Sequence, residues 1–115
     1  MKFQSFEEII AWQKAQDLAV AIYEVFITTR DFGFVNQVRD AVVSVSNNIA
    51  EGYERSTAAD FSRFLVYALG SASEVKSMLY LACRLKYITS DQQSYLVSQT
   101  SEVSKIIKGL IKYLN

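Results

Sequence analysis

The 115-residue chain contains no proline and only four glycines. Proline interrupts helices and glycine weakens them, so a chain nearly free of both favours long helices over a sheet with tight turns. Apolar residues recur at every third or fourth position over long stretches, which is the period of an amphipathic helix. The sequence therefore predicts an all-α fold.

Capping signals divide this pattern into four helices. A Ser or Thr before a helix accepts hydrogen bonds from the first free backbone N–H groups, and a Glu or Gln three residues on completes a capping box. The helix starts are marked by a capping box at Ser5 and Glu8, a cap at Ser56 or Thr57, and a second capping box at Ser90 and Gln93. We expect helices over about residues 5–29, 34–54, 57–86 and 90–114. Short connections between helices of similar length predict an antiparallel, up-down-up-down four-helix bundle in one domain, residues 1–115.

The charges balance over the whole chain but not along it. Twelve Lys and Arg residues match twelve Asp and Glu residues, so no net field draws the protein toward nucleic acid or an anionic membrane. Residues 1–56 carry five basic and eight acidic side chains, whereas residues 57–115 carry seven basic and four acidic ones. Halves of opposite charge favour packing of unlike surfaces, within one chain or between copies.

The remaining composition indicates a cytoplasmic protein without a membrane partner. The single cysteine, Cys83, excludes an intramolecular disulfide and is typical of a reducing compartment. No uncharged apolar run approaches the ~20 residues that span a bilayer, and the amino-terminal segment lacks the apolar core of a signal peptide. The sequence contains no histidine, and we predict neither a cofactor nor a metal.

The segment expected as the third helix is more apolar than an isolated bundle requires. From Phe64 to Cys83 the only charged residues are Glu74 and Lys76. A helix in a monomeric bundle buries one stripe, so much of this apolar surface would face water. Single exposed Tyr and Leu residues are common on monomers, but the length of this stretch favours a homo-oligomer. The interface candidates are Leu65, Tyr67, Leu69, Tyr80 and Leu81.

Polar and small residues recur at helical spacing along the second and third helices, which would face each other as antiparallel neighbours. A glycine inside a helix costs about 1 kcal/mol relative to alanine, so Gly70 predicts a close backbone approach there; Gly52 either serves the same purpose or loosens a helix end. Our leading interpretation is a buried hydrogen-bonded network that fixes helix register. Its expected members are Arg39, Ser44, Asn48, Glu51, Arg55, Ser71 and Glu74.

Three functional interpretations compete with this structural network. Paired carboxylates bind di-iron centres in helical bundles, but those centres use Glu-x-x-His pairs and this chain has no histidine. An acid/base pair of Glu51 and Glu74 would need a substrate cleft, which the pattern does not predict. Contact with a partner stays open. We therefore expect no catalytic residue, no small-molecule substrate and no enzyme.

Basic residues near the carboxyl end form a weaker candidate site. Lys105, Lys108 and Lys112 share one side of the last helix. Together with Arg84 and Lys86 they are candidates for nucleic-acid contact through phosphate groups. The alternative is a solvated helix face whose cations suit the helix dipole near its carboxyl end.

Two motifs resemble the signature of a known family. The first is Asn48 to Gly52 (NIAEG), and the second spans residues 61–74 (FxxFLxxAxGSxxE). Together they resemble the bacterial four-helix-bundle proteins encoded within 23S rRNA intervening sequences, and the similarity covers nearly the whole chain. The chain departs from the family pattern at Asp40, where a second basic residue often follows Arg39.

The resemblance implies a short up-down bundle that assembles as a ring-like homopentamer. It also implies kinship to the accessory variability protein of diversity-generating retroelements, which associates with nucleic acid and a reverse transcriptase. No enzymatic activity is established for the family. Our hypothesis is a non-enzymatic, oligomeric scaffold or adaptor; the alternative is an RNA- or DNA-binding accessory protein that uses a local basic surface of the oligomer.

Overall fold

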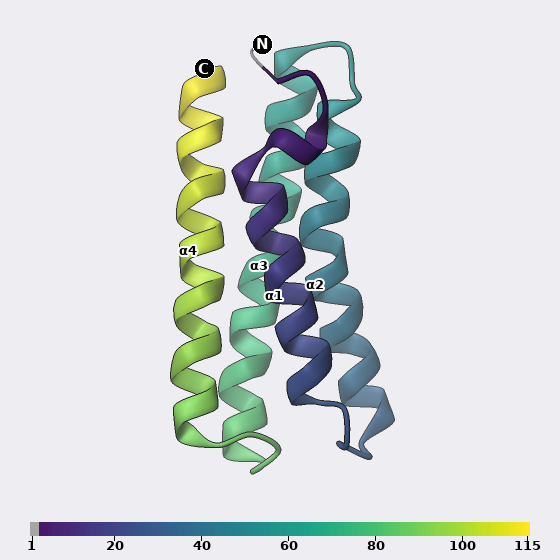
Figure 1. The fold of residues 1–115 in the computed structure, drawn as a ribbon, viewed down its shortest axis with the longest axis vertical. Helices are drawn as coiled ribbons and strands as arrows, with labels where there is room; N and C mark the ends of the chain where they lie inside the picture. Colours follow the sequence, from purple (N-terminus) through teal and green to yellow (C-terminus); the bar gives the residue numbers. More distant parts are fainter. Residues whose placement is uncertain (1–2) are drawn as a thin grey trace.

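A computed structural model describes residues 3–115 of the chain. It contains α1 (Ile10–Val25), α2 (Phe32–Tyr53), α3 (Ala58–Arg84) and α4 (Ser90–Leu114), and no strand in the described residues. Consecutive helices run in opposite directions, so the two chain ends lie at the same end of the molecule (Figure 1). The predicted all-α, four-helix fold is confirmed. Residues 1 and 2 of the expected domain lie outside the described residues.

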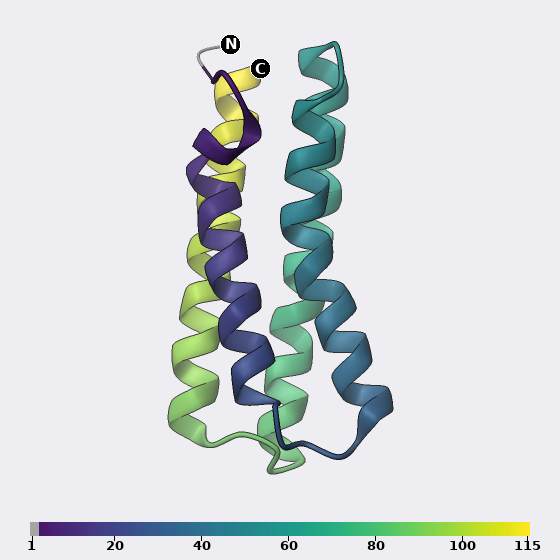
Figure 2. The same cartoon turned by 45° about the vertical axis from the view of Figure 1, so that its right-hand side comes forward.

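Each helix packs on two others, so the bundle has a square cross-section. Contacts join α1 to α2, α2 to α3, α3 to α4 and α4 to α1, within overall dimensions of 43 × 22 × 19 Å. Figure 2 shows α1 beside α4 on one side of the bundle and α2 beside α3 on the other. All four helices contribute fully buried side chains to the core, including Ile22, Ile49, Phe61, Leu65, Leu79 and Ile107.

The first helix is shorter than predicted at both ends. The Ser5 side chain makes no capping hydrogen bond, and residues 6–8 form one turn of 3-10 helix. Ile9 then adopts extended backbone, with φ −78° and ψ 119°, and its side chain is only 2% exposed. Burying Ile9 in the core therefore outweighs the capping box, because an apolar side chain of this size contributes about 1.5–3 kcal/mol when buried. The helix ends at Val25 rather than near residue 29.

Capping residues begin the other three helices. Asp31 accepts from the backbone N of Phe34 and begins α2 two residues earlier than predicted. Thr57 accepts from the backbone N of Asp60, which settles the alternative between residues 56 and 57. The α4 capping box is present but is formed by Thr89 and Gln92, one residue before the predicted pair.

The close approach of α2 and α3 occurs at Gly52 and not at Gly70. A Cβ atom on Gly52 would lie 2.6 Å from Phe64 Cβ and 3.1 Å from the Phe61 ring. Beside Gly70, apart from the surrounding backbone of α3 itself, no atom of residues 3–115 lies within 4 Å of the corresponding position. The prediction for Gly70 is therefore wrong within the protomer, whereas Gly52 has the packing role that the sequence left as one of two alternatives.

Candidate functional site

Three of the predicted polar residues meet between α2 and α3. Ser71 Oγ donates to Ser44 Oγ at 3.0 Å, and Asn48 Nδ2 donates to Ser44 Oγ at 3.0 Å and to the Ser44 backbone O at 2.8 Å. All three side chains are half-buried. This chain of hydrogen bonds links α2 and α3 at one register, as predicted for these three residues. We call Ser44, Asn48 and Ser71 the α2–α3 seam.

The two carboxylates do not join this seam. Glu51 pairs with Arg55 at 3.0 Å, but both side chains are largely exposed, at 57% and 45%. Glu74 is exposed and forms no ion pair with any of residues 3–115. The prediction of a buried network is therefore wrong for these three residues in the protomer. Gly52 lies close against Phe61 and Phe64 of α3, and an unpaired charge buried in such a contact would be costly.

Arg39 points toward α1 instead of α3. Its guanidinium lies 4.6 Å from the centre of the Tyr23 ring, and its buried Nε has no hydrogen-bond partner. A second polar link on this side was not predicted: Gln16 Nε2 donates to Ser46 Oγ at 3.0 Å. The available signal was the position of Ser46, four residues after Val42 and three before Ile49, which places it on the core side of α2.

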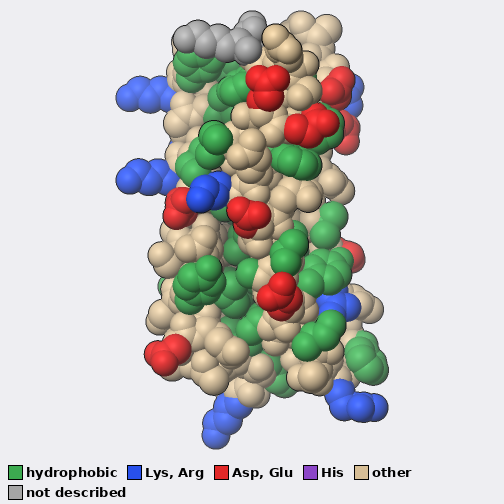
Figure 3. Space-filling view, viewed as in Figure 1, with side chains coloured by type: hydrophobic (Ala, Val, Ile, Leu, Met, Phe, Trp, Pro, Cys, Tyr) green, Lys and Arg blue, Asp and Glu red, His purple; other side chains and the backbone are tan. Residues whose placement is uncertain are grey.

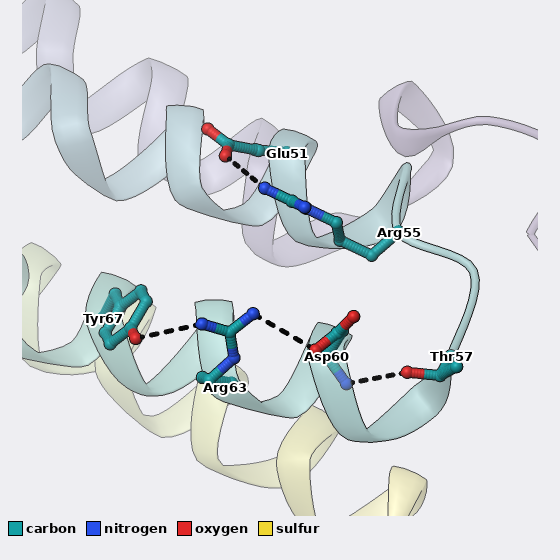
Figure 4. Close-up of polar contacts among 6 residues, drawn as sticks. All are labelled: Glu51, Arg55, Thr57, Asp60, Arg63 and Tyr67. Carbon is teal, nitrogen blue, oxygen red and sulfur yellow. Dashed lines mark hydrogen bonds and ion pairs between the residues drawn. The ribbon is translucent and has the colours of Figure 1, made fainter.

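An arginine pair marks the end of the α2–α3 seam (Figure 4). Arg55 from the α2–α3 connection and Arg63 from α3 flank the Phe64 ring, with their guanidinium carbons 4.7 and 5.1 Å from its centre. Arg63 also donates to Asp60 at 3.1 Å and to the Tyr67 hydroxyl at 3.3 Å. Each arginine has its own carboxylate partner, so this cluster is electrically balanced and offers no surplus charge to a ligand.

The outer face of α3 is apolar and shallow. Val66, Tyr67, Tyr80 and Leu81 are 46–54% exposed. Between them lie the small, exposed residues Gly70 and Ser77, and the exposed Glu74, which is seven residues from both Tyr67 and Leu81. We call these seven residues the α3 face. Two of the predicted interface residues lie elsewhere: Leu65 is fully buried in the core, and Leu69 is half-buried beside it.

A second exposed apolar surface was not predicted. Val20, Tyr23 and Ile27 follow one another at helical spacing along α1 and its end, and Phe32 begins α2 nearby in the chain. All four side chains are more than two-fifths exposed. We call them the α1 face. The helical period of these residues was visible in the sequence, but it did not reveal which side of α1 would face the core.

The predicted basic residues form two separate groups. Lys105, Lys108 and Lys112 are exposed on α4 and form no ion pair within residues 3–115. Figure 3 shows basic side chains projecting from the edge of the molecule where α4 lies. Arg84 and Lys86 are also exposed but precede α4, whose first residue is fifteen positions, or about 22 Å, from Lys105. The five residues therefore do not make one surface.

A groove lies between α3 and α4, and its volume is about 280 Å³. Three lysines line it, one from α3 and two from α4, together with three serines. No acidic side chain is among its lining residues. The lining comprises Ala72, Ser73, Lys76, Ser101, Ser104, Lys105 and Lys108. Lys76, Ser73, Ser101 and Ser104 were not singled out from the sequence, because serines on a polar helix face carry no distinctive spacing.

The described residues contain neither a metal-ligand cluster nor a membrane-spanning helix. Within residues 3–115 no three His, Cys, Asp or Glu side chains gather closely enough to hold a metal ion. Over the same residues, no helix combines the length and apolar character needed to cross a bilayer.

Comparisons with known proteins agree with this architecture. The family model of the 23S rRNA-intervening sequence protein matches residues 7–109. The chain is similar to the crystal structure of a protein of unknown function from the S23 ribosomal protein family of Bacteroides thetaiotaomicron. The two share 28% sequence identity, with a TM-score of 0.83, over 89% of this chain and 98% of that chain. Curated proteins give no match to the sequence.

Proposed function

Because the chain belongs to the 23S rRNA-intervening sequence protein family, we propose that it is a non-enzymatic scaffold or adaptor that works as a homo-oligomer in the cytoplasm. The observation that carries this proposal is the α3 face. Four large apolar side chains are exposed there over about four helical turns, around small residues that let another surface approach closely. Exposed apolar surface of this extent is typical of a contact between proteins.

The partner surface that we propose is the α1 face of a second copy. The α1 face is also apolar, and it belongs to the half of the chain with excess acid, whereas α3 and α4 belong to the half with excess base. Unlike faces on one protomer associate head to tail, and such an assembly is a ring when the rotation between successive copies closes and an open filament when it does not. The closed ring is the form that we propose, and the family resemblance implies a pentamer.

Solution mass tests the assembly. We expect the wild-type protein to exceed one protomer in multi-angle light scattering at micromolar concentration. Leu81→Glu on the α3 face and Val20→Glu on the α1 face should each prevent ring closure, because each places a charge in an apolar contact. Ser98→Glu, an exposed α4 residue on neither face, is the matched control and should assemble normally. A wild-type monomer would contradict the proposal.

Mixing the two variants distinguishes head-to-tail from symmetric pairing. Leu81→Glu retains an intact α1 face and Val20→Glu retains an intact α3 face, so an equimolar mixture should form a one-to-one dimer. A symmetric α3–α3 interface predicts a different result: Val20→Glu alone would remain a dimer, and mixing would produce no new species. Circular dichroism of each variant checks that the helices are retained.

Nucleic-acid binding is the second candidate function, and the specific observation that favours it is the unpaired lysine row on α4. Lys105, Lys108 and Lys112 are exposed without carboxylate partners among the described residues, and a ring would repeat this row on every protomer. The resemblance to the accessory variability protein of diversity-generating retroelements supports the same proposal. Binding to a structured RNA should weaken steeply with salt, since each neutralised phosphate releases counterions. Lack of binding at low salt would exclude this function.

A further inference from the structure

The groove between α3 and α4 collects cations and hydroxyl groups from both of its walls. Ser73 and Lys76 lie one turn apart on α3. On α4 the lining residues follow the spacing of one helix face, and they are Ser101, Ser104, Lys105 and Lys108. Both walls belong to the same protomer, so the groove exists whether or not the chain assembles.

The acidic residues of α3 and α4 do not line the groove, and two of them form ion pairs with other residues. Glu102 does not line the groove and pairs with Lys14 of α1 at 3.7 Å. Asp60 pairs with Arg63 near the start of α3. Neither Glu74 nor Asp91 lines the groove. The three groove lysines therefore line one groove without an ion-pair partner among residues 3–115.

Uncompensated lysines at one site favour an anionic ligand. Lys76 is half-buried, whereas Lys105 and Lys108 are exposed. The positive charges of the three lysines repel one another, and an anion bound in the groove would be attracted to each of them. Ammonium groups act as point-charge ligands for phosphate, and serine hydroxyls are frequent hydrogen-bond donors to phosphate oxygens.

We propose that the α3–α4 groove is a binding site for a ligand with several phosphate groups. The α4 lysines extend the site along the helix axis: Lys105 and Lys108 are about 4.5 Å apart in helical rise, and Lys112 follows about 6 Å further on. Such a row matches a linear series of phosphates better than a single phosphate ion. The inference does not rest on self-association. It deepens the nucleic-acid proposal by naming the residues that would hold the phosphates.

The same phosphate chemistry has two sources, a free oligophosphate and a nucleic-acid backbone, and two probes separate them. Calorimetric titration of the full chain with tripolyphosphate tests the first, and titration with oligouridylate tests the second, both at constant ionic strength. The groove variant is Lys76→Gln/Lys105→Gln/Lys108→Gln. The matched control, Lys14→Gln/Arg30→Gln/Arg55→Gln, removes the same charge from exposed positions outside the groove.

We expect the groove variant to lose at least about tenfold in tripolyphosphate affinity and the control to lose less than about threefold, because the groove lysines would contact the phosphates directly, whereas the control changes only the overall charge. A second variant, Ser101→Ala/Ser104→Ala, leaves the charge unchanged and should still weaken binding. Melting curves verify that all variants are folded. Equal losses in the groove and control variants would overturn the site, as would no binding by the wild type.

The two probes also separate this inference from the nucleic-acid function. Groove-dependent binding of tripolyphosphate without binding of oligouridylate would support the site and exclude nucleic acid as its ligand. Groove-dependent binding of both would support both proposals. Binding of oligouridylate that the groove variant leaves unchanged would overturn the groove site, while nucleic-acid binding elsewhere on the protein would stand.

Discussion

The Tyr87 hydroxyl donates a 2.7 Å hydrogen bond to Asp31 Oδ2 and so ties the α3–α4 connection to the start of α2. The other carboxylate oxygen of Asp31 caps α2 through the backbone N of Phe34 at 3.2 Å. The Tyr87 ring also packs edge-to-face on the Phe34 ring, with centres 5.3 Å apart. One carboxylate therefore serves two connections that lie 56 residues apart.

This contact makes stability depend on pH at the acidic end. The hydrogen bond from Tyr87, and then that from Phe34, lowers the pKa of the Asp31 carboxyl below its ordinary value. The stabilisation is therefore present above the pKa of unfolded Asp and is lost as pH falls through the lowered pKa of the folded protein. The same bond raises the pKa of the Tyr87 hydroxyl, so at the alkaline end the stabilisation is lost as pH rises through that raised pKa.

We predict that Tyr87→Phe lowers the melting temperature at neutral pH, because it removes the hydroxyl while keeping the ring against Phe34. The difference from wild type should shrink as pH falls through the titration of Asp31, since a protonated carboxyl no longer accepts the bond in the same way. Thermal melts across acidic and neutral pH measure this. A difference that stays constant over that range would show that the hydrogen bond is not responsible.

The two α2–α3 glycines should respond in opposite directions to alanine. Gly52→Ala forces a Cβ against Phe64 and should destabilise the protein by about 1–3 kcal/mol, the usual range for overpacking. Gly70→Ala meets no neighbour within 4 Å and should stabilise α3 by about 0.5–1 kcal/mol through helix propensity. Urea unfolding in the Leu81→Glu background measures both in the protomer. Destabilisation by Gly70→Ala in that background would be inconsistent with the open space beside Gly70.

Leu65 and Leu81 were both predicted at the oligomer interface, but their substitution should affect different properties of the protein. Leu65→Ala removes a fully buried core side chain and should reduce the free energy of unfolding by about 2–5 kcal/mol. Leu81→Ala, at an exposed position, should change protomer stability by less than about 0.5 kcal/mol and act on assembly instead. Urea unfolding and light scattering on the same pair provide the comparison. Equal losses of stability would mean that Leu81 is buried in the protomer.

Removal of the Ser71 hydroxyl should destabilise the protein more than removal of the Glu51 carboxylate. Glu51→Ala breaks only an exposed ion pair, and such pairs contribute about 0–1 kcal/mol. Ser71→Ala removes a half-buried hydrogen bond to Ser44, which contributes about 0.5–1.5 kcal/mol. A double-mutant cycle with Ser44→Ala isolates the coupling between the two hydroxyls. Zero coupling would indicate that the two hydroxyls do not interact in solution.

The sequence predicted which residues share one side of α2 or α3, but it did not predict which of them are buried between the helices. Helical spacing correctly grouped Ser44, Asn48 and Ser71, because residues at such steps share a face whatever lies opposite them. It also grouped Glu51 and Glu74 with them, although these residues lie just outside the contact line. A rotation of a fraction of a helical turn separates a buried position from an exposed one, and periodicity alone does not resolve that difference.

The helix starts show a similar division between local and global forces. Thr57, one of the two predicted caps, begins α3, because the cap and the buried face of α3 favour the same starting residue. The Ser5–Glu8 pattern favours a capping box, but the Ser5 side chain makes no capping hydrogen bond. Ile9 is buried in extended backbone, which interrupts the helix predicted from Ser5. A capping residue thus begins a helix where burial of the nearby apolar residues favours the same start, and it does not where burial favours another backbone conformation.

The amino-acid sequence alone determined that the chain forms four helices in an all-α bundle, because scarce helix breakers and apolar periodicity act within each segment. Only the tertiary structure decided which side of each helix is covered. That choice turned Leu65 into a core residue, left Val66 and Leu81 in water, and aligned Lys76 of α3 with Lys105 of α4 along one groove. Helix formation depends on neighbours three or four residues away, whereas surfaces and grooves depend on how separate helices rotate against one another, and that rotation is set by packing of the whole core.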